Sequence, residues 1–141
     1  MNTSDITGLG TATVTPFKTD GLVDYEALEK FMEFQISGGV NFLVPCGTTG
    51  ETPTLTDDEQ DEVIRITLRV ANGRVPVVAG CTHNSTREVV ARGKRLKALG
   101  IDHVLSASPY YNKPTQEGIY RHMKALHEEA GVEILVYSVQ G

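Results

Sequence analysis

The sequence predicts an α/β protein in which parallel strands alternate with helices, and three observations support this class. Five apolar runs recur about every thirty residues, which is the length of one strand-helix-strand unit. Between them lie four segments whose apolar residues repeat with helical periodicity. Each helical segment follows a residue that can cap it and precedes a glycine or asparagine that can end it.

The five apolar runs are short and nearly continuous, as expected of strands that are buried on both faces of a parallel sheet. They comprise residues 9–14, 41–46, 75–79, 103–107 and 134–137. A parallel neighbour is reached only through a crossover, so each intervening segment must return the chain to the same end of the sheet. The strict alternation therefore predicts βαβ units throughout.

The first two predicted helices each carry one apolar face. The first follows Asp24, a suitable N-cap, and ends before Gly38. Its apolar residues fall on one side of the helix: Leu28, Phe31, Met32 and Ile36. The second helix begins with Thr56 and Glu59 at the spacing of a capping box and ends at Asn72.

The third and fourth predicted helices use the same devices. Ser85 and Glu88 repeat the capping-box spacing at the start of the third helix, which ends at Gly100. Thr115 can cap the fourth helix, and Gly131 ends it. Four helices are therefore expected to separate five strands.

Two closures of the sheet are compatible with this alternation. We expect a partial (β/α)8 TIM barrel of about four βα units plus a fifth strand, because single apolar faces suit the outer ring of such a barrel. The alternative is an open, doubly wound parallel sheet with helices on both faces. Neither linker nor low-complexity segment interrupts residues 1–141, so we expect a single domain, the N-terminal half of the barrel.

Composition narrows the classes of partner. The 141 residues are 40% hydrophobic and 22% charged, with a net charge of −5 and no run rich in lysine or arginine, which argues against nucleic acid. No apolar stretch approaches the roughly 20 residues that span a bilayer, which argues against a membrane. Cys46 and Cys81 lie inside apolar runs, so we expect buried free thiols in a reducing cytoplasm. Small molecules are the expected partners.

Function in either architecture collects at the carboxyl ends of the strands. The second strand leads into Pro-Cys-Gly-Thr-Thr-Gly-Glu at residues 45–51, where Thr48 and Thr49 offer hydroxyl and N–H donors to a small carboxylate. The competing interpretation is an ordinary glycine-rich turn whose threonines satisfy local backbone groups.

Two tyrosines lie at the ends of later strands. Tyr111 is in the proline-bracketed segment 108–114 after the fourth strand, and Tyr137 ends the fifth strand. Each could instead pack its ring on the core or the rim of the sheet. Together with Thr48 they could form a chain of hydroxyl groups that transfers protons.

A metal site is not predicted. Cys46, Cys81 and His83 lie near the ends of neighbouring strands, but they lack the close pairing of cysteines that marks zinc sites. We interpret His122 and His127 as solvated residues of the fourth helix.

Four segments resemble the dihydrodipicolinate synthase family of class I pyruvate aldolases, the superfamily that includes the N-acetylneuraminate lyases. They are Gly-Thr-Thr-Gly-Glu at 47–51, Pro-Tyr-Tyr-Asn-Lys-Pro at 109–114 with Gln-Glu-Gly at 116–118, Thr-Val-Thr-Pro-Phe at 13–17 and Val-Val-Ala-Gly at 77–80. The resemblance implies an eightfold barrel in which a lysine on the sixth strand forms a Schiff base with pyruvate. The resulting enamine attacks aspartate semialdehyde in lysine biosynthesis.

The resemblance also implies roles for five residues. Thr49 would bind the pyruvate carboxylate, and Ala12 would line the pocket. Tyr137 would act as general acid and base, Thr48 would pass protons, and Tyr111 would complete that relay from a neighbouring subunit. The resemblance implies neither a metal nor an organic cofactor. Self-association is expected for a different reason, because a sheet that stops after its fifth strand leaves two edges unpaired.

The sequence departs from the family pattern in two places. The Schiff-base lysine of the family would lie beyond Gly141, and the family's Tyr-Asn-Val-Pro reads Tyr-Ser-Val-Gln at residues 137–140. We therefore expect a half-enzyme that is inactive alone. The alternatives are a natural or engineered non-catalytic half-barrel scaffold and a sugar-acid aldolase of the same superfamily.

Overall fold

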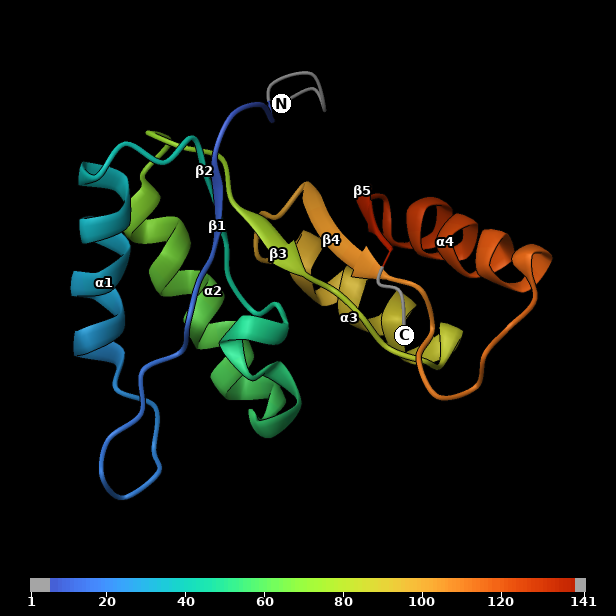
Figure 1. The fold of residues 1–141 in the computed structure, drawn as a ribbon, viewed down its shortest axis with the longest axis horizontal. Helices are drawn as coiled ribbons and strands as arrows, with labels where there is room; N and C mark the ends of the chain where they lie inside the picture. Colours follow the sequence, from blue (N-terminus) through green and yellow to red (C-terminus); the bar gives the residue numbers. More distant parts are fainter. Residues whose placement is uncertain (1–5, 139–141) are drawn as a thin grey trace. The chain divides into compact units, whose positions relative to one another are not determined.

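A computed structural model describes residues 6–138 of the chain. The chain divides into two compact units, Met1–Ala79 and Gly80–Gly141. The division falls within the strand β3 (Val78–Gly80). Figure 1 shows the succession of strands and helices along each unit. The expected single domain stays a prediction.

The first unit is built from two parallel strands and two helices. Its elements in chain order are β1 (Gly10–Ala12), α1 (Tyr25–Ser37), β2 (Phe42–Val44), the short 3₁₀ turns η2 (Thr48–Gly50) and η3 (Thr52–Thr54), and α2 (Asp57–Ala71). In the parallel pair, Gly10 lies opposite Phe42 and Ala12 opposite Val44. The N–H of Leu43 also donates to the carbonyl of Pro76 at 3.0 Å, which places the segment before β3 beside β2. The predicted parallel order is confirmed here.

The core of the first unit lies between its strands and its two helices. Leu28 and Met32 of α1 are fully buried, as predicted from the apolar face of this helix. Leu43 of β2 and Ile64 of α2 are equally buried. This packing holds α1 and α2 side by side, as Figure 1 shows for the blue and green helices.

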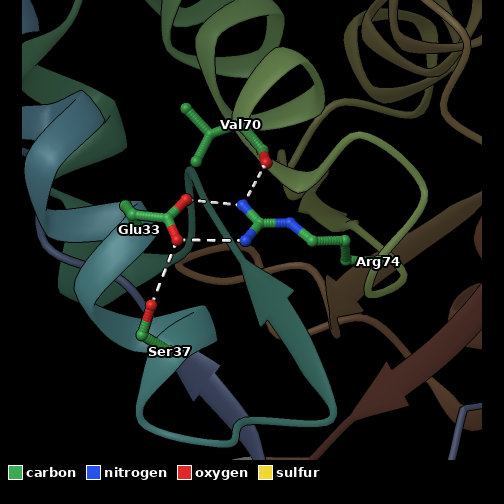
Figure 2. Close-up of polar contacts among 4 residues, drawn as sticks. All are labelled: Glu33, Ser37, Val70 and Arg74. Carbon is green, nitrogen blue, oxygen red and sulfur yellow. Dashed lines mark hydrogen bonds and ion pairs between the residues drawn. The ribbon is translucent and has the colours of Figure 1, made fainter.

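An ion pair joins α1 to the turn after α2. Two guanidinium nitrogens of Arg74 donate to the two carboxylate oxygens of Glu33, at 3.0 and 2.5 Å. Figure 2 shows the same guanidinium donating to the carbonyl of Val70 at 2.7 Å, while the hydroxyl of Ser37 donates to Glu33 at 3.1 Å. These donors, Arg74 first, lower the pKa of Glu33 to about 2. Glu33 therefore carries its charge throughout the neutral range.

The second unit repeats the same plan. After β3 its elements are α3 (Thr86–Ala98), β4 (His103–Ala107), α4 (Gln116–Ala130) and β5 (Glu133–Tyr137). The strands β4 and β5 are parallel, with His103 opposite Glu133 and Ala107 opposite Tyr137. Directly after β3, the N–H of Cys81 donates to the carbonyl of Leu105 at 2.9 Å.

The two helices of the second unit approach closely at a glycine. A Cβ atom on Gly93 of α3 would lie 2.6 Å from the Cδ1 atom of Leu126 and 2.8 Å from the Cβ atom of Ala130, both on α4. Such distances are far below van der Waals contact. The absence of a side chain at position 93 thus permits the packing of α3 on α4.

The predicted helix ends are confirmed almost residue by residue. Thr56 and Glu59 form the reciprocal capping box at the start of α2, with bonds of 3.3 and 2.8 Å. At α3 the Ser85 hydroxyl caps the N–H of Glu88, but the Glu88 carboxylate accepts a bond from Arg87 instead of returning one.

Among the described helices, none has the length and apolar character needed to cross a bilayer.

One helix residue contradicts its predicted environment. His122 is 2% exposed, whereas we expected a solvated side chain. Its Nδ1 atom lies 2.9 Å from the hydroxyl of Thr86, so α4 turns this ring toward the first turn of α3. Burial, followed by the nearby His83, lowers the pKa of His122. His127 is exposed as predicted, although its Nδ1 atom lies 2.8 Å from the carbonyl of Val132.

Candidate active site

The carboxyl end of the β1–β2 pair carries the first predicted site residue. Ala12, the last residue of β1, is exposed, whereas Thr13 and Thr15 in the segment that follows the strand are buried. The N–H of Thr13 donates to the carbonyl of Val44 at 3.1 Å and extends the pairing beyond the strand ends. Ala12 therefore lies on the open side of a fixed strand pair.

Thr48 and Thr49 lie in the tight turn that follows β2. The N–H of Gly50 donates to the carbonyl of Gly47 at 3.0 Å, and the N–H of Glu51 donates to that of Thr48 at 3.1 Å, which closes the η2 turn. Both threonine side chains are exposed. Their interaction with a ligand stays a prediction.

Other threonines satisfy the backbone of this loop. Thr52 donates its hydroxyl proton to the carbonyl of Gly47 at 3.0 Å, and Thr54 donates to that of Glu51 at 2.8 Å. From the segment after β1, the buried hydroxyl of Thr15 donates to the carbonyl of Gly50 at 2.7 Å. The loop is thus bonded both to itself and to the neighbouring strand.

Gly50 allows the loop to lie against the end of β1. A Cβ atom at this position would lie 3.1 Å from the carbonyl oxygen of Thr13 and 3.3 Å from the hydroxyl of Thr15. The absence of a side chain at the second glycine of the Gly-Thr-Thr-Gly sequence therefore permits this close approach. It brings the turn with Thr48 and Thr49 to the carboxyl end of both strands.

Tyr137 lies at the carboxyl end of β5, as predicted. It is opposite Ala107, the last residue of β4, and it shares a face of the strand with Leu135. Its side chain is 46% exposed, so the ring is not a core residue in this chain. The end of β4 is held in turn by the N–H of Ala107, which donates to the hydroxyl of Thr82 at 3.0 Å.

Tyr111 projects from the loop between β4 and α4. Its backbone is left-handed, with φ of 67°, and its side chain is 92% exposed. The neighbouring Asn112 donates from Nδ2 to the carbonyl of Asn84 at 3.3 Å and accepts from Asn84 Nδ2 at 3.4 Å. The competing interpretation required the ring to pack on the rim of the sheet. In this chain the ring does not do so.

The predicted site residues are grouped within each unit. Ala12, Thr48 and Thr49 lie at the carboxyl ends of β1 and β2, while Tyr111 and Tyr137 follow β4 and β5. The chain of hydroxyl groups from Thr48 through both tyrosines stays a prediction. The departure from the family pattern at residues 139 and 140 lies outside the described residues.

The cysteines are free and buried, as predicted. Burial raises the pKa of the Cys81 thiol to about 12, so this group is uncharged at neutral pH. Within residues 6–138 no group of three or more His, Cys, Asp or Glu side chains is close enough to hold a metal ion.

None of the six lysines of the chain lies on a strand. Lys30 of α1 pairs with Glu26 at 2.6 Å, and Lys97 of α3 pairs with Asp102 at 2.7 Å. The other four are on helices or in loops: Lys18, Lys94, Lys113 and Lys124. The described strands therefore carry no amine that could attack a bound keto acid.

Sequence reasoning overlooked Gln60, a buried residue of α2 that contacts the Thr48–Thr49 loop. Its amide nitrogen donates to the carbonyls of Thr52 and Leu55, both at 3.2 Å. One signal for it was available in the sequence. Gln60 lies one turn after the cap Thr56 and three residues before the buried Val63, so it belongs to the inward face of α2.

Comparison with known proteins identifies the family pattern along the chain. The model of the Dihydrodipicolinate synthetase family matches residues 5–141. The 4-hydroxy-tetrahydrodipicolinate synthase of Koribacter versatilis is 56% identical over 135 residues, and that of Rhizobium meliloti is 52% identical over 131 residues. These matches cover 95% and 93% of this chain but only 45% and 44% of the two relatives.

Solved structures give the same result. The dihydrodipicolinate synthase of Acinetobacter baumannii, crystallised with pyruvate, has a TM-score of 0.92 and 48% identity. The synthase of Thermotoga maritima has a TM-score of 0.90 and 45% identity. The matches cover 95% and 94% of this chain and 46% and 44% of those chains. The chain thus spans just under half of its relatives, with the fold of a partial (β/α)8 barrel.

Proposed function

Because the chain belongs to the dihydrodipicolinate synthetase family, we propose that it is the N-terminal half of a Schiff-base-forming pyruvate aldolase. The complete enzyme condenses pyruvate with aspartate semialdehyde in lysine biosynthesis, in the cytoplasm. The observation that carries this proposal is the loop after β2. It holds Thr48 and Thr49 exposed at the carboxyl ends of two parallel strands, where barrel enzymes bind substrates.

The first unit supplies the carboxylate site. Thr49 binds the carboxylate of pyruvate with its hydroxyl and backbone donors, and Ala12 lines the pocket from the open face of β1. A small residue suits this position because it leaves room for the substrate. The rigid, bonded turn supports this role, since a preorganised donor loses little entropy when the ligand binds.

The proton-transfer groups are Tyr111 and Tyr137 of the second unit and Thr48 of the first. A Schiff base withdraws electrons from the methyl carbon of pyruvate, and a general base must then remove a proton from that carbon. Tyr137 takes this role from the end of β5. Thr48 passes protons onward, and Tyr111 completes the relay from a neighbouring subunit, to which its 92% exposed side chain is available.

The nucleophile must come from outside these 141 residues. The six lysines of the chain lie on helices or in loops, and the two closest to carboxylates are paired with Glu26 and Asp102. We therefore propose that the chain alone does not form the imine. The strands that follow in the family would supply the amine and the remaining wall of the pocket.

Borohydride reduction in the presence of pyruvate tests this function. We expect no stoichiometric pyruvyl adduct on the 141-residue chain by mass spectrometry. A longer protein that continues through the sixth strand should carry one adduct on a single lysine. A stoichiometric adduct on any lysine of the short chain would refute the proposed half-enzyme.

The longer protein also separates the two alternatives. Turnover of pyruvate with aspartate semialdehyde supports the synthase, whereas turnover of keto-deoxy sugar acids alone would indicate a sugar-acid aldolase. The lack of an adduct on the longer protein would indicate a non-catalytic scaffold.

A further inference from the structure

The loop that carries Thr48 and Thr49 contains two residues in a disfavoured backbone conformation. Cys46 has a φ of 56° and Glu51 a φ of 54°, both in the left-handed region. Residues other than glycine stay in this region only where their surroundings hold them. The loop therefore depends on contacts from outside itself to keep its shape.

Gln60 supplies contacts at both ends of this loop. At the beginning, the thiol of Cys46 lies 3.9 Å from the backbone carbonyl of Gln60 and donates to it. At the end, the side-chain amide of Gln60 donates to the carbonyls of Thr52 and Leu55, both at 3.2 Å. One residue of α2 thus bridges the two flanks of the turn that exposes Thr48 and Thr49.

The chemistry of these contacts fits glutamine. An amide NH₂ group has two hydrogens, so it can satisfy two carbonyls at once, whereas a carboxylate has none to offer. Gln60 is 9% exposed, so water has little access to replace the lost bonds. A carbonyl that loses its partner in such a place destabilises the conformation that contained it.

We propose that Gln60 is a positioning residue of the pyruvate site. It holds the loop of residues 46–55 in the conformation in which Thr48 and Thr49 face the ligand. The pyruvate part of this inference rests on the proposed function, whereas the holding of the loop rests on the hydrogen bonds alone.

Amide hydrogen exchange tests the holding of the loop in the 141-residue chain. Four loop N–H groups are bonded within the loop and report on its opening: Gly50, Glu51, Thr54 and Leu55. We expect Gln60→Met to raise their exchange rates about tenfold, because the variant keeps the length of the side chain and removes both donors. The N–H of Asn72, bonded at the far end of α2, should be unaffected.

Thr67→Val is the matched control. Thr67 is also buried on α2, but its hydroxyl donates to the carbonyl of Val63 within the helix. We expect this variant to leave the exchange of the loop amides unchanged. Unchanged loop exchange in Gln60→Met, or an equal increase in both variants, would overturn the proposal.

Gln60→Glu provides a second test if Gln60→Met does not fold. A protonated carboxyl group has one donor and an ionised one has none. Loop protection in this variant should therefore increase on acidification from pH 7.5 to 5, relative to the wild type. Protection that is independent of pH and equal to that of the wild type would contradict the role of the amide.

The kinetics of the longer protein separate this inference from the proposed function. We expect Gln60→Met to raise the KM for pyruvate several-fold with a smaller change in kcat, and Thr67→Val to change neither. Faster loop exchange with an unchanged KM would support the role of Gln60 in holding the loop. The unchanged KM in that experiment would, however, refute the assignment of Thr49 to the pyruvate carboxylate.

Discussion

Glu33 shows how single residues connect elements that are distant in sequence. Its carboxylate accepts two hydrogen bonds from Arg74, which is 41 residues away, and one from Ser37 on its own helix. Helical periodicity identified α1 and α2 but could not predict this pair, because the distance along the sequence gives no information on which surface residues meet. Only the packed helices show it.

The lowered pKa of Glu33 predicts a pH-dependent contribution to stability. The pKa falls from 4.5 to about 2, so the folded state favours the ionised carboxylate. The contribution is fully present above the unfolded pKa and is lost as the pH falls toward about 2. Thermal melts of the wild type and Glu33→Gln between pH 7 and 2 should differ at neutral pH and converge in acid.

Glu26→Gln is the control for this measurement. Glu26 pairs with Lys30 one turn away on the same helix and does not join α1 to another element. We expect a smaller shift of the melting temperature than for Glu33→Gln. Both shifts should decrease at high salt because the charges are exposed. A Glu33→Gln difference that persists unchanged at pH 2 would contradict the role of the charge.

At the scale of elements, Gly93 determines how closely α3 packs on α4. At an exposed position inside a helix, replacing glycine by alanine stabilises the helix by about 1 kcal/mol. Here the new Cβ atom would lie 2.6 Å from Leu126 and 2.8 Å from Ala130. Overpacking of this kind typically costs about 1–3 kcal/mol, so we expect Gly93→Ala to be destabilising overall in urea unfolding.

Ala91→Gly on the exposed side of α3 calibrates this comparison. It measures the helical preference for alanine over glycine without a packing contact. If Gly93→Ala stabilised the chain by the amount that Ala91→Gly destabilises it, the close approach of the two helices would be disproved.

The helices were predictable from sequence to a greater degree than the strands. Side chains that cap helices, such as Thr56 and Thr115, act locally and are visible in the sequence. A strand ends where its partner ends, so β1 and β2 are three residues long although their apolar runs are six. The sequence pattern does not indicate the burial of His122, because the ring meets Thr86 of another helix.

The site was predictable only in part for the same reason. Thr48, Thr49, Tyr111 and Tyr137 lie at strand ends, where a parallel sheet is expected to place its functional groups. Gln60 is inside a helix and contacts the loop through its side chain, so neither a motif nor a strand end indicated it. Contacts made by a supporting residue are a property of the folded chain.

At the scale of the whole molecule, the sequence alone could not choose between a barrel and an open sheet. Both consist of the same βα units, and the difference lies in how the sheet closes. The similarity to dihydrodipicolinate synthases over about 95% of this chain identifies the fold as part of a barrel and not as an open sheet.

We expect the isolated chain to self-associate. In the described residues, β1 pairs with β2 on one side and β5 with β4 on one side, so each has an unpaired edge. Val14 and Val136 are 45% and 62% exposed, and apolar exposure costs about 25 cal/mol per Å². Light scattering over a dilution series should show dimers or larger species at micromolar concentration. A compact monomer with a cooperative melt would contradict this expectation.

The bonds that shape the Thr48–Thr49 turn have a consequence for the order of events during synthesis on the ribosome. The hydrogen-bond partners described for this turn, from Thr15 to Gln60, belong to the first 60 residues. Tyr137 is added 77 residues after Gln60, which takes roughly 4–15 s at the usual rate of translation, about 5–20 residues per second. The nascent chain can therefore complete the turn that we assign to the pyruvate carboxylate several seconds before the residue assigned to proton transfer has been made.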